Sequence, residues 1–259
     1  MSELSQFVSL EDGGRVRWTL IHREDVAPHS HVEGQLVYAA SGVLTTTSER
    51  GTWVAPANRI SWTPPRFAHH HHAYGATEIR LIEIPRKWCG PMPDHPTVFG
   101  VSGLLREAVL KLTSGDMALP AQDRLLGVVV DELVDLPEES LHLPAPLDDR
   151  LRAVIAMLQG DPADSATLSM LGHAVGASER TLSRLFQAEL GMSFYQWRTL
   201  LRVQYALVHL VDGRSVTDTA LLCGWANPTS FIEAFTTVVG QTPGRYLRSA
   251  SRAGHDSSR

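Results

Sequence analysis

Histidines cluster in two short stretches of this chain, and imidazole side chains at this spacing can bind a metal ion or hydrogen-bond a polar ligand. The first stretch contains His29 and His31, and the second is a run of four histidines that begins at His69. Alternate residues of a β-strand point to the same face, so we expect His29 and His31 to point together, and His69 and His71 likewise. If the two strands lie close together, these side chains form a polar pocket.

The chemistry of this pocket has more than one interpretation. Three or four converging imidazoles could bind Zn²⁺, Ni²⁺ or Fe²⁺, whereas the same groups could instead hydrogen-bond an organic effector or pair with backbone. Gln35 argues against a metal, because a neutral carboxamide is a poor metal ligand. We expect an effector pocket made of five residues: His29, His31, Gln35, His69 and His71. Of these, His29, His31 and His69 are the candidate metal ligands.

A degenerate repeat near the C-terminus points to a different chemistry. Residues 168–191 and 216–240 align at an offset of 48 residues before a turn and 49 residues after it, with Gly176 opposite Gly224. Each copy has the pattern of a short helix, a glycine-containing turn and a second amphipathic helix, which is typical of a helix-turn-helix unit. A tandem pair of such units predicts a protein that binds double-stranded DNA.

Capping residues mark where the helices of this repeat begin. Ser178 can cap the second helix of the first unit, and two capping boxes are predicted at Ser193 with Gln196 and at Ser215 with Asp218. Between the units, residues 193–211 form one amphipathic helix about 28 Å long. Two recognition helices on one face of DNA sit roughly 34 Å apart, so this helix is a suitable spacer.

Charge and hydropathy limit the class of protein. The net charge of −5 is unevenly spread. Residues 1–146 carry 12 basic and 18 acidic side chains, whereas residues 147–259 carry 11 basic and 10 acidic side chains. The second part is only weakly basic, so we expect weak and salt-sensitive non-specific binding to DNA. No apolar run approaches the ~20 residues that span a bilayer, and the N-terminus has no signal-peptide pattern, which predicts a cytoplasmic protein without a membrane partner.

The elements that position these residues divide the chain into two parts. Short runs rich in Val, Thr, Trp and Ile over residues 15–90 predict a small antiparallel barrel, and apolar spacing then predicts helices over 101–112 and 122–136. The expected domains are an all-β barrel over 1–92, a helical extension and linker over 93–146, an all-α domain over 147–250 with helix-turn-helix units at about 167–190 and 215–239, and a disordered tail over 251–259.

Several motifs follow one another over residues 150–249, namely SERTLSRLFQAELGMSFYQW, then GWANPTSFxxxF and GxTPxxYL. In this order they resemble the signature of the AraC/XylS family of bacterial transcription regulators. In the N-terminal part, PHSHVEGQLVYAASGVL and TPPRFAHHHH resemble the two motifs of cupin domains. The resemblance implies a cupin-like sensor barrel followed by an AraC-type DNA-binding domain.

The same resemblance implies which residues contact the bases, because family members use exposed positions early in the second helix of each unit. In the first helix-turn-helix unit those positions are Arg180, Ser183 and Arg184. In the second they are Thr229, Ser230 and Glu233. Arginine can bind guanine with two hydrogen bonds, and glutamate can accept one from cytosine. The second unit departs from the family in having Glu233, Thr236 and Thr237 where many members carry basic residues. We therefore expect the first unit to dominate affinity.

Together these features favour a one-component transcription regulator, without enzymatic activity, that is controlled by a small molecule or a metal ion in the cupin domain. The expected partners are operator or promoter DNA, that effector, a second copy of the chain and, for an activator, RNA polymerase. The helical extension has an apolar stripe that forms either the dimer surface or a contact with its own barrel. The stripe consists of Leu125, Leu126, Val129, Val130 and Leu133.

The alternative function is a metal-dependent cupin enzyme fused to a DNA-binding domain. Gln35 occupies the position where metal cupins usually carry a glutamate ligand, and no acid–base pair is evident near the histidines. Both features weigh against the enzyme.

Overall fold

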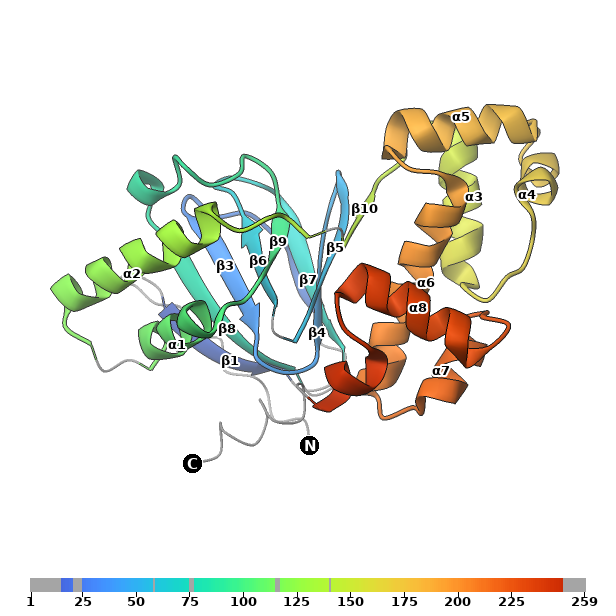
Figure 1. Ribbon diagram of the computed structural model, residues 1–259. Helices are drawn as coiled ribbons and strands as arrows, with labels where there is room; N and C mark the ends of the chain where they lie inside the picture. The colour runs from blue at the N-terminus through green and yellow to red at the C-terminus, as the bar shows by residue number, and fades with distance from the viewer. Residues whose placement is uncertain are drawn as a thin grey trace, which may run out of the picture. The chain divides into compact units, whose positions relative to one another are not determined.

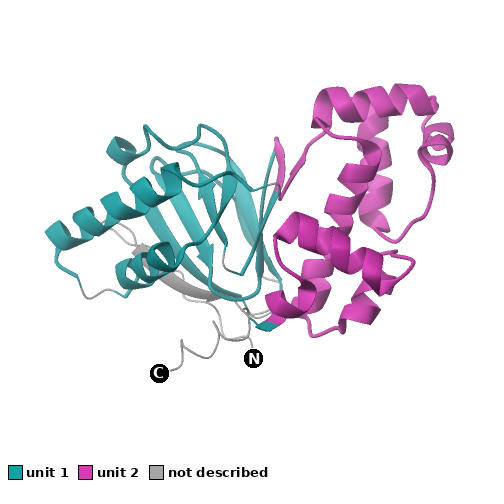
Figure 2. Cartoon of the chain, in the orientation of Figure 1, with its two compact units in different colours: residues 1–48, 53–140, 248–259 teal, residues 49–52, 141–247 magenta. Residues whose placement is uncertain are grey.

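The chain divides into a unit that is rich in strands and carries two helices, and a unit that is mostly helical (Figures 1 and 2). The computed structural model describes residues 15–20, 25–57, 59–74, 77–114, 117–139 and 141–248. Unit 1 takes in residues 1–48, 53–140 and 248–259, and unit 2 takes in residues 49–52 and 141–247. The tail over 251–259, predicted to be disordered, lies outside the described residues. No helix in the described ranges is both long and apolar enough to cross a membrane.

The strands form two five-stranded sheets. The first has the order β1 (Arg15–Leu20), β8 (Thr77–Ile84), β3 (Gly34–Ala39), β6 (Arg59–Thr63) and β9 (Thr97–Gly100). The second has the order β10 (His142–Pro144), β5 (Gly51–Pro56), β4 (Val43–Ser48), β7 (His69–Tyr74) and β2 (Asp25–His29). Consecutive strands β3 and β4 belong to different sheets, because β3 pairs with β6 and β8 whereas β4 pairs with β7. The described strands therefore build two sheets and not the small antiparallel barrel that the sequence predicts.

The two sheets pack face to face around an apolar core. Val37 of β3 and Leu81 of β8 come from the first sheet, and they cluster with Leu44 of β4 and Ala73 of β7 from the second. Side chains alternate along each strand, so the opposite face of β3, β6 and β8 points away from the second sheet. Helices α1 (Gly103–Leu112) and α2 (Leu119–Val134) cover that face (Figure 1).

The apolar stripe of α2 packs against its own sheet. Leu126, Val129 and Leu133 are fully buried in one cluster with Leu36 of β3 and Ile82 of β8. Val130 is also buried there, and Leu125 is partly buried against the same cluster. The stripe is therefore not a dimer surface, because its side chains are already buried against the sheet of the same chain.

Unit 2 contains, besides β10, six labelled helices: α3 (Asp149–Gly160), α4 (Leu168–Ala174), α5 (Glu179–Leu190), α6 (Phe194–Val211), α7 (Val216–Leu222) and α8 (Pro228–Val239). The predicted cap at Ser178 is confirmed, and so is the capping box of Ser193 with Gln196. The second predicted capping box is wrong. Ser215 does accept a hydrogen bond from the Asp218 backbone, but the Asp218 carboxylate accepts from the Ser215 hydroxyl instead of returning to the backbone.

Candidate nucleic-acid interface and histidine site

The two helix-turn-helix units share one backbone plan. In each, a glycine in the left-handed region makes the turn, with a φ of 66° at Gly176 and 79° at Gly224. This conformation costs a residue with a Cβ about 1–2 kcal/mol, which explains why glycine occupies both turns. The second helix of each unit then buries aromatic or aliphatic residues on its inner face. These are Leu182 and Phe186 of α5, and Phe231 and Phe235 of α8.

All six residues predicted to contact bases are exposed on the outer faces of α5 and α8. On α5 they are Arg180, Ser183 and Arg184, and on α8 they are Thr229, Ser230 and Glu233. Among the described residues, the side chains of Arg180 and Arg184 form no hydrogen bond or ion pair. Both guanidinium groups therefore remain available to an external partner with acceptor groups, such as the edge of guanine or a phosphate.

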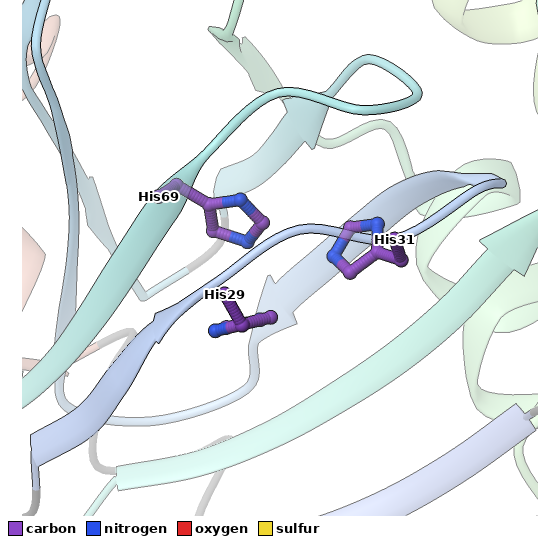
Figure 3. A group of neighbouring side chains, drawn as sticks. All are labelled: His29, His31 and His69. Atoms are coloured by element: carbon purple, nitrogen blue, oxygen red, sulfur yellow. The ribbon is translucent and has the colours of Figure 1, made fainter.

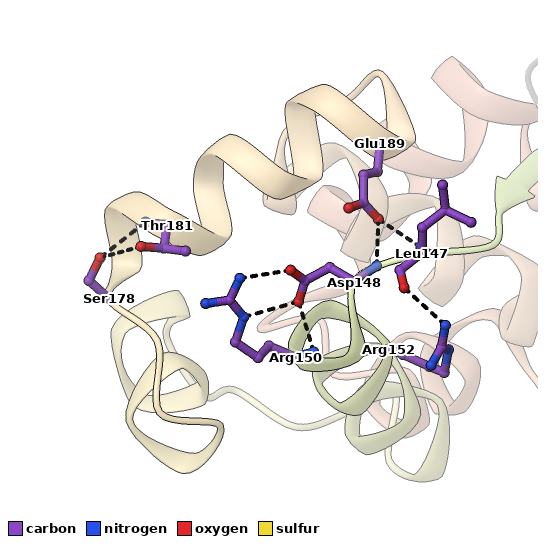
Figure 4. A network of polar contacts seen from close by, with 7 residues as sticks. All are labelled: Leu147, Asp148, Arg150, Arg152, Ser178, Thr181 and Glu189. Carbon is purple, nitrogen blue, oxygen red and sulfur yellow. Dashed lines mark hydrogen bonds and ion pairs between the residues drawn. The ribbon is translucent and has the colours of Figure 1, made fainter.

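Other arginines of unit 2 are already paired with carboxylates, and Figure 4 shows the pair of Arg150 with Asp148. Arg150 contacts Asp148, with 2.7 Å between Nη2 and Oδ2, and Arg152 pairs with Asp149. The hydrogen bond from Arg150 lowers the pKa of Asp148 to about 2. These pairs offset the positive charge of α3, whereas the charges of Arg180 and Arg184 on α5 are not offset in this way.

A polar network also anchors the end of α5 to the start of α3 (Figure 4). One carboxylate oxygen of Glu189 accepts hydrogen bonds from the backbone N–H groups of Leu147 (2.7 Å) and Asp148 (3.1 Å). Glu189 could not be predicted from the sequence, because a half-buried glutamate late in a helix has no local signature of this contact. The network helps to fix the orientation of α5, the helix that carries both free arginines.

In unit 1, which contains the two sheets, His29, His31 and His69 form a compact group (Figure 3). One ring nitrogen from each lies within 4.8 Å of the others. The ring centroids of His29 and His69 are 4.4 Å apart, and those of His31 and His69 are 4.9 Å apart. The expected strand geometry is wrong in one respect, because β2 ends at His29 and His31 lies in the loop that follows. That loop nevertheless brings His31 to the other two rings.

Backbone contacts fix the tautomer of all three rings. The Nδ1–H groups donate to the carbonyl oxygens of nearby residues, at 2.8 Å for His29, 3.1 Å for His31 and 2.9 Å for His69. A carbonyl oxygen can only accept, so each Nδ1 carries the proton and each Nε2 presents a lone pair. The Nε2 atoms of His31 and His69 are buried and have no hydrogen-bond partner among the described residues.

Burial favours the neutral form of His31 and His69. Loss of solvent lowers the pKa of His69 to about 4 and also lowers the pKa of His31, and the neighbouring imidazoles add to both shifts. At neutral pH these two rings therefore offer lone pairs and no positive charge. Buried acceptors without a donor are costly, so the group suits either a divalent cation or a ligand that donates hydrogen bonds. Metal-binding histidines commonly donate their second ring N–H to a backbone carbonyl in this way.

His71 and Gln35, the other two predicted pocket residues, engage each other. Both are buried, and His71 donates from Nε2 to Oε1 of Gln35 at 3.1 Å. The hydroxyl of Thr46 lies 3.0 Å from the other ring nitrogen of His71 and donates to it. Both ring nitrogens of His71 are thus occupied, so His71 does not join the three-histidine group. Thr46 was not predicted, because nothing distinguishes it from the neighbouring threonines of β4.

Comparisons with known proteins support the assignment of helix-turn-helix structure to unit 2. A helix-turn-helix domain family matches residues 171–249. The transcriptional regulator NimR of Escherichia coli is 34% identical over 222 residues, which cover 85% of this chain and 81% of NimR. The chain therefore belongs to the AraC family of helix-turn-helix transcription regulators, a class of DNA-binding proteins.

Two further matches differ in how much of the chain they cover. The transcriptional regulator RipA of Corynebacterium glutamicum is 36% identical over 103 residues, or 40% of this chain and 31% of RipA. A crystal structure of ToxT from Vibrio cholerae with a bound unsaturated fatty acid covers 92% of this chain and 97% of ToxT, at 12% identity and a TM-score of 0.38.

Proposed function

We propose that a ligand bound by His29, His31 and His69 in a cupin-like sensor domain controls how this AraC-family regulator binds its operator. The observation that carries the proposal is the pair of buried, unpartnered Nε2 atoms in the three-histidine group. Their protons are held on the opposite nitrogens, so the group is arranged to receive a ligand and not to stabilise itself.

We further propose that the six exposed residues of α5 and α8 read the DNA. Arg180 and Arg184 would each bind guanine through O6 and N7, and Glu233 would accept from the amino group of cytosine. The two arginines attract the phosphate backbone, whereas Glu233 is repelled by it. The first unit therefore supplies most of the affinity, and the second unit mainly supplies sequence preference and register.

The ligand favoured by this chemistry is a divalent metal ion of the Zn²⁺, Ni²⁺ or Fe²⁺ type. Such ions take neutral imidazole nitrogens as ligands, and three of them leave positions open for water or a small molecule. The three histidines come from the end of β2, the loop after it and the start of β7. A bound ion would therefore connect two segments of unit 1 that are about 40 residues apart in the sequence, which gives it a means of changing their relative position.

Elemental analysis of the untagged protein, purified without chelators, tests the first part. We expect about one metal ion per chain in the wild type, because three histidines make one site. His69→Ala should lose the metal, whereas His70→Ala should keep it, since the neighbouring side chain points to the other face of β7. Equal metal content in the two variants would contradict the assignment of the site.

DNase footprinting on the DNA upstream of the gene tests the second part, with and without the metal that is found. We expect the metal to change the protected region or the protein concentration at which protection begins, and His69→Ala to abolish that change. A footprint that is the same under both conditions would show that the site does not control DNA binding. Rapid turnover of a small molecule by the metal-loaded protein would favour the enzyme alternative.

A further inference from the structure

Arg202, in the middle of α6, clamps the loop that leads into the first helix-turn-helix unit. Its Nε donates to the carbonyl oxygen of Pro162 at 2.8 Å, and its Nη2 donates to that of Asp164 at 2.9 Å. A longer contact of 3.5 Å joins Nη2 to the carbonyl oxygen of Ala163. One guanidinium group thus binds three consecutive residues of this loop, which ends at the N-cap of α4.

The turn of the second unit lies against the same loop and the same guanidinium group. A Cβ atom added to Gly224 would come within 2.7 Å of the Ala163 Cα and within 2.8 Å of Arg202 Nη2. The next residue, Trp225, has its ring centroid 5.9 Å from the guanidinium carbon of Arg202, within the range of a cation–π contact. Arg202 therefore touches the entry to the first unit and the turn of the second.

Trp225 continues this connection into the recognition helix of the second unit. Its ring lies 5.0 Å from that of Phe231, centroid to centroid, and Phe231 is fully buried in α8. On the other side, the clamped loop leads through Thr167 into α4, whose Leu171 is buried in the core shared with α5. A continuous set of contacts that includes Arg202 thus joins the two recognition helices.

Arg198, one turn earlier on α6, offers a useful contrast. It donates to the carbonyl oxygen of Ala166 and stacks over Phe194, with 4.3 Å between its guanidinium carbon and the ring centroid. These contacts hold the same loop, but among the described residues they involve no part of the second unit. Arg198 and Arg202 are thus matched in residue type, helix and partner loop, and they differ in whether they reach Trp225.

We propose that Arg202 is a positioning residue that fixes the placement of one helix-turn-helix unit relative to the other, so that both bind one DNA duplex in a single register. The inference rests on the proposed function, in which both units contact the same operator. A fixed spacing makes binding by the second unit effectively intramolecular once the first is bound, which raises affinity only for DNA with matching geometry. Tolerance of altered spacing is therefore the property that depends on Arg202.

The experiment uses the full chain and a duplex selected from a random pool by the wild-type protein. Derivatives of this duplex carry one or two extra base pairs between the segments protected by the two units. Each added base pair rotates the second segment by about 35°. We expect one insertion to weaken wild-type binding by about 100-fold, the scale of a lost second contact. For Arg202→Met we expect weaker binding to the parent duplex and a loss of less than about 10-fold on insertion.

Arg198→Met is the control, because it weakens the loop contact without changing the contact with Trp225. It should keep the full penalty for insertion, even if it lowers the thermal stability of the unit. Should Arg202→Met fail to fold, as judged by circular dichroism, Arg202→Lys provides the same comparison, since an ammonium group cannot bind three carbonyls in the same way.

An insertion penalty in the Arg202 variant equal to that of the wild type would overturn the inference, as would an equal reduction in Arg198→Met. Wild-type tolerance of the insertion would also overturn it, because the units would then be independent. Failure of the wild-type protein to select any sequence would contradict the proposed function itself.

Discussion

Helices α5 and α8 occupy equivalent places in the two helix-turn-helix units, yet their exposed faces differ in charge. Arg180 and Arg184 are exposed on α5, whereas the corresponding face of α8 carries Thr229, Ser230 and Glu233. Their buried faces are alike, since both helices bury large apolar side chains and both contact the preceding helix and α6. Both helices also end at a glycine in the left-handed region, with φ of 69° at Gly191 and 77° at Gly240.

This contrast separates the residues that specify the fold from those that specify its partner. A helix-turn-helix unit needs an apolar inner face and a turn that accepts positive φ, and both units meet that need. It does not need any particular side chain on the outer face. Differences on the outer face can therefore give the two helix-turn-helix units different roles in binding. We expect the unit with two arginines to bind an anionic duplex more strongly than the unit with a glutamate.

The two turns differ as well, in how tightly they are packed. A Cβ atom at Gly176 would meet nothing within 4 Å, whereas one at Gly224 would lie 2.7 Å from the backbone of Ala163. The first turn is therefore open on its outer side, and the second is pressed against the loop before α4. Equivalent positions of the repeat thus tolerate change differently.

The largest expected effect comes from alanine at these two turn glycines. Gly176→Ala should cost about 1–2 kcal/mol of unfolding free energy, the penalty for positive φ alone. Gly224→Ala should cost more than about 3 kcal/mol, because overpacking against backbone is added to that penalty. Urea unfolding followed by far-UV circular dichroism measures both. Equal losses in the two variants would mean that the loop moves aside easily.

Arg184→Ala should weaken binding to the selected duplex by about 1–3 kcal/mol, the value of one bidentate contact with guanine. Fluorescence anisotropy at a fixed salt concentration measures the change. Arg152→Ala is the matched control, since Arg152 is also exposed but is paired with Asp149. A similar loss in both variants would indicate that the arginines act only through net charge.

Glu233→Ala should have the smallest effect on affinity, within about 1 kcal/mol, because removing a negative charge near phosphates offsets a lost contact with a base. We expect it instead to relax the sequence preference beneath α8. Selection from a pool randomised only in that segment measures the preference. An unchanged preference would show that Glu233 does not contact a base.

Much of the helical unit could be predicted because its signals are local. Ser178, Ser193 and Asn227 lie next to the helices they cap, and their hydrogen bonds link residues close in sequence. The strands were harder to predict. β9 has four residues and β10 has three, too few for a recognisable alternation, and β10 lies in a proline-rich segment expected to be a linker.

Contacts between distant segments could not be predicted from the sequence. The apolar stripe of α2 looked the same whether it packed on a second copy or on its own sheet, and only the fold shows that Leu126 and Leu133 contact β3 and β8. The grouping of His29, His31 and His69 was predicted from their spacing and from the cupin-like motifs, but the pairing of His71 with Gln35 and Thr46 was not. Nor did Arg202 stand out, since its partners are carbonyls of a loop about 40 residues away.

The unequal contribution of the two units is tested most directly by measuring wild type, Arg184→Ala and Glu233→Ala on one panel of duplexes. The panel contains the selected sequence and single base changes beneath α5 and beneath α8. We expect Arg184→Ala to bind every duplex weakly and to lose discrimination only beneath α5. Glu233→Ala should bind nearly as well as the wild type and lose discrimination only beneath α8. Small and equal effects of both substitutions across the panel would contradict this account of how the two units bind DNA.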